Sequence, residues 1–244
     1  MKRITALIAT TSLMLCVFLF ASLAYAEGSL QLSPLRLSLS DLENITTLTV
    51  KNRGATSSLV QLEVLNWTQK NGVDIFEPTR DILVSPPVFT IAPGAEQVLR
   101  AVSRRKADNN KELTYRLFVR EVQDQAKPAD DNTIKVLLNI SLPIFIQSDI
   151  KSLPKLVWSA KNISAQKFSL KLTNNGMQHI QVKSFQLIDT NGDKILQNTM
   201  HYVLPDSATE WILEGSLQSF KSPMTIQALT DNGELRETIT LEKQ

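Results

Sequence analysis

The 244-residue sequence is poor in the residues that most often carry chemistry. It has a single cysteine, Cys16, and only two histidines, His179 and His201. One cysteine cannot form an intramolecular disulfide, and neither histidine stands at the spacing of a zinc site. We therefore expect no metal and no cofactor, and we expect each histidine to be an ordinary surface or core residue. Stability must come from apolar packing and strand pairing.

Motifs of catalysis are also missing. The sequence has no Gly-x-Ser-x-Gly elbow, no Gly-x-Gly-x-x-Gly fingerprint and no Walker loop. Its carboxylates are scattered, and the adjacent pair Asp130 and Asp131 lies in the polar stretch 123–133, which is typical of an exposed loop. We therefore expect no catalytic residue. A hydrolase whose triad comes from distant loops would leave no motif, so it stays a third alternative.

The N-terminal residues have the pattern of a signal peptide. Two basic residues precede an apolar stretch over residues 4–23, and Ala24-Tyr25-Ala26 supplies the small residues of a cleavage site. We predict that residues 1–26 are removed after export. A signal anchor that stays in the membrane is the alternative, because the apolar stretch approaches spanning length. The remaining chain has 24 basic and 24 acidic residues, and this balance favours neither nucleic acid nor stable membrane insertion.

Beyond residue 26, short segments of alternating apolar and polar residues recur between turn signals such as Asn71-Gly72 and Pro93-Gly94. This pattern is typical of an all-β protein built from antiparallel sandwiches. The length suits two domains, which we place at residues 27–148 and 149–244. We predict strands over residues 35–39, 46–51, 59–67, 97–102, 113–122 and 134–146 in the first domain, and over 156–159, 168–173, 180–187, 210–213, 225–228 and 237–241 in the second.

One short pattern occurs in both predicted domains. Residues 48–54 and 170–176 each read as an alternating strand that runs into an Asn-x-Gly turn. The pattern weakly favours two copies of a related unit.

The predicted strand 134–146 carries a long apolar stripe. Every second residue is large and apolar, and these residues are Ile134, Val136, Leu138, Ile140, Leu142, Ile144 and Ile146. The stripe could lie in the core of its own sandwich. It could instead be offered to a partner by β-augmentation, in which backbone hydrogen bonds give affinity and alternate side chains fill pockets. Periodicity alone does not separate the two.

Several short motifs follow one another in a familiar order. They are Ser33-Pro34-Leu35-Arg36, Ser85-Pro86-Pro87-Val88-Phe89, Ile91-Ala92-Pro93-Gly94, Gln97-Val98-Leu99-Arg100 and Thr114-Tyr115-Arg116-Leu117, and the apolar stripe comes after them. In this order the chain resembles the periplasmic fimbrial chaperones of the chaperone–usher pathway, and it is most similar to their archaic branch. The resemblance implies two immunoglobulin-like sandwiches in tandem and a periplasmic location.

The resemblance also implies a mechanism. Pilus subunits of this pathway lack their last strand, and the chaperone lends one until the subunit reaches an outer-membrane usher. Here Ile134, Val136, Leu138 and Ile140 would enter the groove of the subunit. Such family members perform no catalysis.

Strand lending needs a fixed register, which the family sets by binding the C-terminal carboxylate of the subunit. In many members the anchor is an arginine on the first strand with a lysine on the lending strand. Arg36 matches the arginine, but Pro143 stands at the position of the lysine. In archaic members the arginine of the Tyr-Arg pair takes this role, which implies Arg116 here, with Lys151 as the nearest basic helper.

A second class of function stays open from the sequence. A secreted β-sandwich could be an adhesive or carbohydrate-binding module that uses Trp67, Trp158 and Trp211 as stacking platforms. These residues lie within or beside predicted strands, where burial is the ordinary outcome. Exposed tryptophans in one cluster would favour this alternative.

Overall fold

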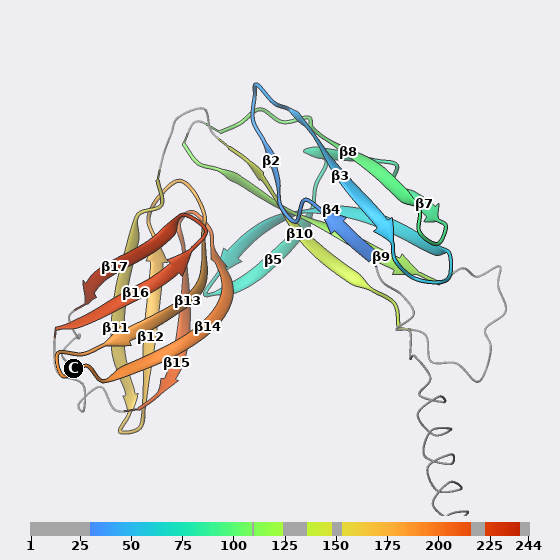
Figure 1. The fold of residues 1–244 in the computed structure, drawn as a ribbon. Coiled ribbons are helices and arrows are strands. Elements are labelled where there is room, and N and C mark those ends of the chain that lie inside the picture. The colour runs from blue at the N-terminus through green and yellow to red at the C-terminus, as the bar shows by residue number, and fades with distance from the viewer. Residues whose placement is uncertain (1–29, 109, 124–135, 148–152, 216–222, 240–244) are drawn as a thin grey trace, which may run out of the picture.

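The computed structural model describes residues 30–108, 110–123, 136–147, 153–215 and 223–239. Within these residues the regular structure consists of strands, β1 to β17, in four sheets. Figure 1 shows that the strands form two groups, β1 to β10 and β11 to β17, and that one end of the first group lies against one end of the second. No helix among the described residues is long and apolar enough to span a membrane. The prediction of an all-β fold with two sandwiches is confirmed. The predicted signal peptide and the predicted boundary at 148/149 lie outside the described residues.

The first sandwich consists of a four-stranded and a six-stranded sheet. The four-stranded sheet has the order β1 (Leu30–Ser33), β3 (Ile45–Asn52), β8 (Glu96–Ser103) and β6 (Ile82–Ser85). The six-stranded sheet has the order β2 (Leu37–Leu39), β10 (Asn139–Ile146), β9 (Leu113–Val122), β4 (Ser58–Lys70) and β5 (Val73–Pro78), and β7 (Val88–Ile91) also pairs with β4. All pairs are antiparallel except β2 with β10.

The core of the first sandwich follows from the alternation of its strands. Tyr115, Leu117 and Val119 on β9 are fully buried, as are Leu48 on β3 and Leu99 on β8. Successive side chains of a strand point to opposite faces, so the residues between these form the outer faces. Burying each large apolar side chain contributes about 1.5–3 kcal/mol, which suffices for a sandwich of this size without staples.

The second sandwich has a three-stranded and a four-stranded sheet. The first has the order β11 (Leu156–Ser164), β12 (Lys167–Asn174) and β15 (Ser207–Glu214), and the second has the order β14 (Lys194–Val203), β13 (Ile180–Ile188), β16 (Met224–Thr230) and β17 (Gly233–Ile239). Its core is centred on Phe168, Leu170, Phe185 and Ile226, all buried.

The repeated Asn-x-Gly pattern marks the same structural device in both sandwiches. Asn52 and Asn174 are buried at the ends of β3 and β12, and each side-chain oxygen accepts a hydrogen bond from the glycine N–H two residues on. Each Nδ2 donates to two backbone carbonyls of neighbouring segments. At Gly176 a Cβ would meet the backbone N of Lys155 at 2.3 Å, so this close approach requires glycine.

The prediction of one strand over residues 134–146 is wrong, because the strand in the structure is shorter. β10 begins only at Asn139, and residues 136–138 are not part of a strand, while Ile134 lies outside the described residues. β1, β5, β6, β7 and β14 were not predicted.

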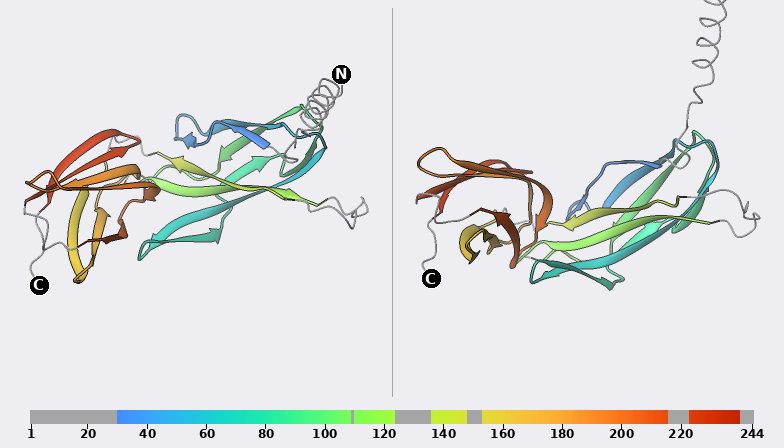
Figure 2. Two further views of the ribbon diagram at one scale, coloured as in Figure 1. Left: turned by 60° about the horizontal axis from the view of Figure 1, so that its bottom comes forward. Right: turned by 90° about the horizontal axis from the view of Figure 1, so that it is seen from below.

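The two sandwiches meet through a small aromatic cluster. Trp67 on β4 and Phe145 on β10 are fully buried against Leu204 and Tyr202 of the second sandwich. The side chain of Gln69 donates to the carbonyl of Tyr202 and accepts from the N–H of Leu204. Figure 2 shows β9 and β10 running from this junction to the far end of the first sandwich.

Candidate functional site

One edge of β10 is open over part of its length. β10 pairs with β9 from Asn139 to Ile146, but the parallel pairing with β2 covers only Ile144 to Ile146. Over Asn139–Pro143, β10 therefore has a strand neighbour on one side only among the described residues. An edge of this kind presents backbone N–H and C=O groups to which another strand can pair.

The apolar stripe divides into two halves at this edge. Leu142, Ile144 and Ile146 are buried in the core of the first sandwich, with exposures of 3%, 0% and 0%. Ile140 is half-buried against the same core, while Val136 is 66% exposed. The C-terminal half of the stripe is therefore kept by its own sandwich, and the N-terminal half becomes progressively free.

The free half is tied to β9 near its start. The N–H of Glu121 donates to the carbonyl of Leu138 at 2.8 Å, and the N–H of Leu138 reaches Oε2 of Glu121 at 3.3 Å. Leu138 itself is half-buried, and its neighbour Leu137 is 41% exposed. The segment thus continues along β9 with apolar side chains accessible.

Arg116 lies on β9, the middle strand of the same sheet, with its side chain on the outer face near the junction of the two sandwiches. It stands opposite Pro143 on β10 and Leu65 on β4, and the buried Tyr115 and Leu117 on either side turn it away from the core. Burial lowers the pKa of Arg116, and electrostatic interactions with neighbouring groups offset part of this lowering. No carboxylate of the described residues forms an ion pair with it, and its buried Nε has no hydrogen-bond partner there. A charged guanidinium without an ion-pair partner can donate hydrogen bonds to the carboxylate of another molecule.

Arg36 lies near Arg116 but has a partner. Arg36 comes directly before Leu37, which stands opposite Ile144, and both Arg36 and Arg116 lie near enough to Tyr202 to lower the pKa of its hydroxyl, although burial raises that pKa overall. The Nη1 of Arg36 forms an ion pair of 2.9 Å with Asp231 of the second sandwich. The structure thus places Arg36 close to Arg116, but part of the Arg36 guanidinium is bound at the junction of the two sandwiches. Lys151 lies outside the described residues.

A buried histidine links the two sandwiches at their junction. His179 stacks on Phe145 with ring centroids 3.6 Å apart, and its Nδ1 is 2.6 Å from Oε2 of Glu112. Its Nε2 lies 3.4 Å from Oδ2 of Asp231. From the sequence we expected His179 to be an ordinary surface or core residue. The sequence around His179 contains no signal of this role, because Glu112 and Asp231 are far from it in the chain.

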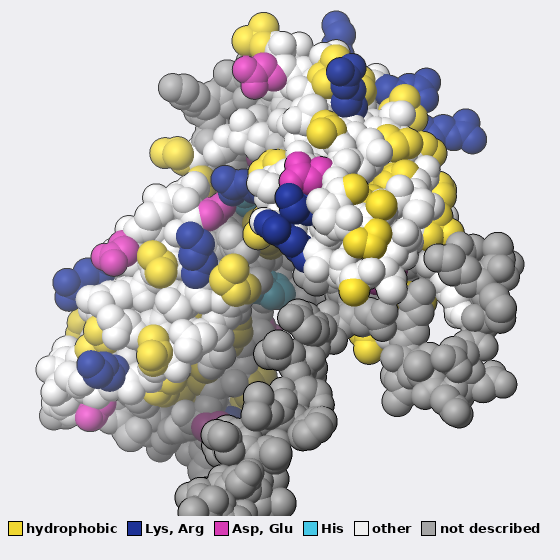
Figure 3. Space-filling model, turned by 45° about the vertical axis from the view of Figure 1, so that its right-hand side comes forward, with side chains coloured by type: hydrophobic (Ala, Val, Ile, Leu, Met, Phe, Trp, Pro, Cys, Tyr) yellow, Lys and Arg dark blue, Asp and Glu magenta, His cyan; other side chains and the backbone are white. Residues whose placement is uncertain are grey.

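The surface near the junction combines charge and apolar character. On the face seen in Figure 3, basic side chains lie where the two sandwiches meet, and hydrophobic side chains gather over the first sandwich. Exposed hydrophobic residues of this sandwich include Ile45, Leu83, Val88 and Val98.

The three tryptophans form no exposed platform. Trp67 is fully buried and Trp158 is 6% exposed. Trp211 is half-buried and stacks on Trp158 with centroids 5.9 Å apart. This placement does not fit the carbohydrate-binding alternative, which needs rings open to a sugar.

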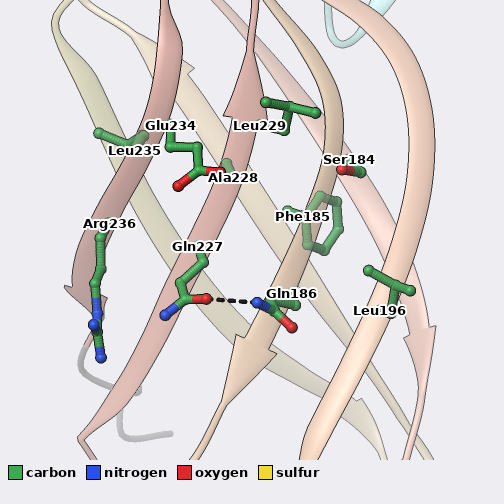
Figure 4. A pocket seen from close by; sticks show the side chains of 10 residues that line it. All are labelled: Ser184, Phe185, Gln186, Leu196, Gln227, Ala228, Leu229, Glu234, Leu235 and Arg236. Atoms are coloured by element: carbon green, nitrogen blue, oxygen red, sulfur yellow. Dashed lines mark hydrogen bonds between the residues drawn. The ribbon is translucent and has the colours of Figure 1, made fainter.

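A hollow of about 540 Å³ lies on the second sandwich, over β13, β14, β16 and β17. Its lining includes Ser184, Glu234 and Arg236, and Gln186 donates to Gln227 across it (Figure 4). The lining has no histidine and no second carboxylate that could activate the serine, so it does not resemble a hydrolase site.

The chain matches a family described as pili and flagellar-assembly chaperone, PapD N-terminal domain, over residues 29–149. It belongs to the PapD family of pilus assembly chaperones. The chain is therefore a pilus assembly chaperone and not an enzyme, which confirms the prediction from its sequence. No curated protein sequence matches the chain.

Solved structures of pilus chaperones share the PapD-like fold. The CsuC chaperone, solved with the tip subunit CsuE from the archaic Csu pili of Acinetobacter baumannii, is 23% identical, with a TM-score of 0.68 over 88% of this chain and 100% of that one. SafB of Salmonella enterica, solved with the SafA pilin, is 18% identical, with a TM-score of 0.62 over 88% and 99%. The E. coli chaperone DraB is 21% identical, with a TM-score of 0.61 over 89% and 98%.

Proposed function

We propose that this chaperone binds incomplete immunoglobulin-like pilus subunits by donor-strand complementation and delivers them to an outer-membrane usher. The observation that carries the proposal is the open edge of β10 over Asn139–Pro143, preceded by apolar side chains that the chaperone does not bury. CsuC and SafB, which have the same fold, were solved with a pilus subunit.

The lent residues are Ile134, Val136, Leu138 and Ile140. Each apolar side chain that enters a subunit groove contributes about 1.5–3 kcal/mol, less the cost of ordering the segment. Ile140 contributes less than Val136, because it already packs against the chaperone core. Backbone hydrogen bonds along the open edge complete the pairing.

The register is set by the C-terminal carboxylate of the subunit, which binds Arg116. This residue has the properties of an anchor, since it is charged, half-buried and without an ion pair among the described residues. Arg36 assists from nearby, and Lys151 is the candidate for a third basic group. A charge-assisted contact of this kind contributes about 1.5–3 kcal/mol.

The test replaces Val136 by threonine and Leu138 by asparagine in one variant. Capture of the pilus subunit on co-expression in the periplasm should fail, while the melting temperature should fall only modestly. Leu196→Asn serves as the matched control, because Leu196 is 66% exposed on the second sandwich and should leave capture intact. A large loss of melting temperature in the double variant would show that this segment serves the chaperone's own core.

A further inference from the structure

The guanidinium of Arg116 rests on an aromatic platform. Its central carbon lies 3.8 Å from the centroid of the Trp67 ring and 5.4 Å from that of Tyr202. The Tyr202 ring meets Trp67 edge-on, with centroids 5.5 Å apart and an interplanar angle of 84°. Trp67 is held in turn by Phe145 on β10, with centroids 6.2 Å apart.

Stacking has a specific consequence for an arginine. It occupies one flat face of the guanidinium and leaves the N–H groups in its plane free to donate. Those donors match the two oxygens of a carboxylate, provided that the plane is fixed before the ligand arrives. Because no carboxylate of the described residues pairs with Arg116, the stacking rings are the groups that fix this plane.

Tyr202 brings the second sandwich into the site. It lies on β14, and the two hydrogen bonds between Gln69 and the backbone of Tyr202 and Leu204 hold this end of β14 against β4. The position of the ring therefore depends on how the sandwiches pack. The sandwich that lends no strand still contributes one wall of the anchor.

We propose that Trp67 and Tyr202 are positioning residues for Arg116, through which the second sandwich sets the affinity for the terminal carboxylate of the subunit. This inference rests on the proposed role of Arg116. Neither ring touches the carboxylate, since both act on the plane of the guanidinium. A merely structural role for Trp67 would affect all binding equally, so the test must isolate the carboxylate.

Two synthetic peptides with the same alternating valine and threonine sequence provide that test, one ending in a free carboxylate and the other in an amide. Their dissociation constants are measured by fluorescence anisotropy. The unaltered chaperone should prefer the carboxylate peptide by about tenfold or more. Trp67→Leu and Tyr202→Leu should each reduce that preference several-fold and leave the affinity for the amide peptide unchanged. Tyr202→Phe should keep the preference, because it keeps the ring.

Phe76 supplies the matched control. It is an aromatic residue on β5 of the same sheet that packs edge-on against Phe118, so Phe76→Leu should leave the preference unchanged. If the unaltered chaperone shows no preference, Arg116 is not the anchor, and both the proposed role and this inference fall. If the preference exists but survives in both leucine variants, the inference alone is wrong. An equal loss of affinity for both peptides would also overturn it. Should Trp67→Leu fail to fold, the half-buried Tyr202 decides the matter.

Discussion

His179 of the second sandwich and Glu112 of the first are joined through Nδ1 and Oε2, which lie 2.6 Å apart. Oε2 also accepts the backbone N–H of His179. On its other side the imidazole faces Asp231, which pairs with Arg36, and the ring of Tyr202 lies 5.6 Å away. Burial lowers the pKa of His179, but hydrogen bonds and charges from the two carboxylates outweigh this, so the pKa stands above its ordinary value.

This geometry predicts a pH-dependent junction. A raised histidine pKa adds stability that is fully present below the unfolded value of about 6.5 and is lost as the pH rises through the folded pKa. The pKa of Asp231 is pushed up by burial but is lowered overall by His179, the Gln181 N–H and Arg36, so its contribution is lost only in acid. The melting temperature of the unaltered chain should therefore exceed that of His179→Gln most at about pH 6 and less at about pH 9.

His201 offers a control of opposite sign. Burial lowers the pKa of its imidazole, so this histidine is neutral in the fold and opposes stability in acid. The difference in melting temperature between the unaltered chain and His201→Gln should therefore not shrink as the pH rises, whereas the difference for His179→Gln should shrink. Calorimetric curves in which the His179→Gln difference is constant across this range would contradict the histidine link.

Removal of the proposed anchor should separate binding from folding. Arg116→Ala should weaken the subunit complex by about 10- to 150-fold, corresponding to about 1.5–3 kcal/mol, and leave the chain folded. Arg116→Lys should restore only part of the affinity, because an ammonium lacks the planar donor fork. Affinity for the subunit and circular dichroism of the free chaperone check both parts. If the Arg116→Ala variant does not fold, Arg116 has a structural role and is not the anchor proposed here.

Arg36 should matter less than Arg116. Its ion pair with Asp231 is partly exposed, with 47% of the Arg36 side chain accessible, so Arg36→Ala should cost at most about 1 kcal/mol of folding stability. Subunit affinity should fall by a smaller factor than in Arg116→Ala, since Arg36 is shared with the junction. Denaturant titration and binding measurements on the two variants give this comparison. A greater loss of affinity in Arg36→Ala would reverse the roles proposed for the two arginines.

The two halves of the stripe should differ in their effect on stability. Ile144→Ala empties a fully buried position and should cost about 2–5 kcal/mol. Val136→Ala removes a side chain that is 66% exposed and should change the free energy of unfolding by about 0.5 kcal/mol or less. Equal losses in denaturant unfolding of the two variants would show that the stripe is one continuous core element.

The sequence predicted those elements whose alternation has one apolar and one polar face. β9 and β13 were found nearly at their observed bounds, because their inward residues are large and regular. β14 was missed, because polar Gln197, Asn198 and Thr199 at its centre interrupt the alternation of its apolar residues. β1, β6 and β7 were missed because a strand of four residues is too short to show a period.

Less of the candidate site than of the fold could be predicted from the sequence. Arg116 was found through a family motif, and its freedom from an ion pair agrees with that prediction without testing it. The support from Trp67 and Tyr202 was not predicted, because these residues lie in different sandwiches. The division of the stripe near Ile140 was not predicted either, since periodicity shows which face of a strand is apolar and not where the neighbouring strand β2 begins.

The most direct test of strand lending is hydrogen–deuterium exchange of the backbone amides of residues 136–142, in the free chaperone and in its complex with a pilus subunit. Because the N–H groups of a strand point alternately to its two sides, the open edge predicts that the amides of this segment that face away from β9 gain strong protection on binding, while those of residues 144–146, which have strand neighbours on both sides, change little. Protection that appears elsewhere and leaves residues 136–142 unchanged would contradict the account, because the subunit would then bind without pairing to β10.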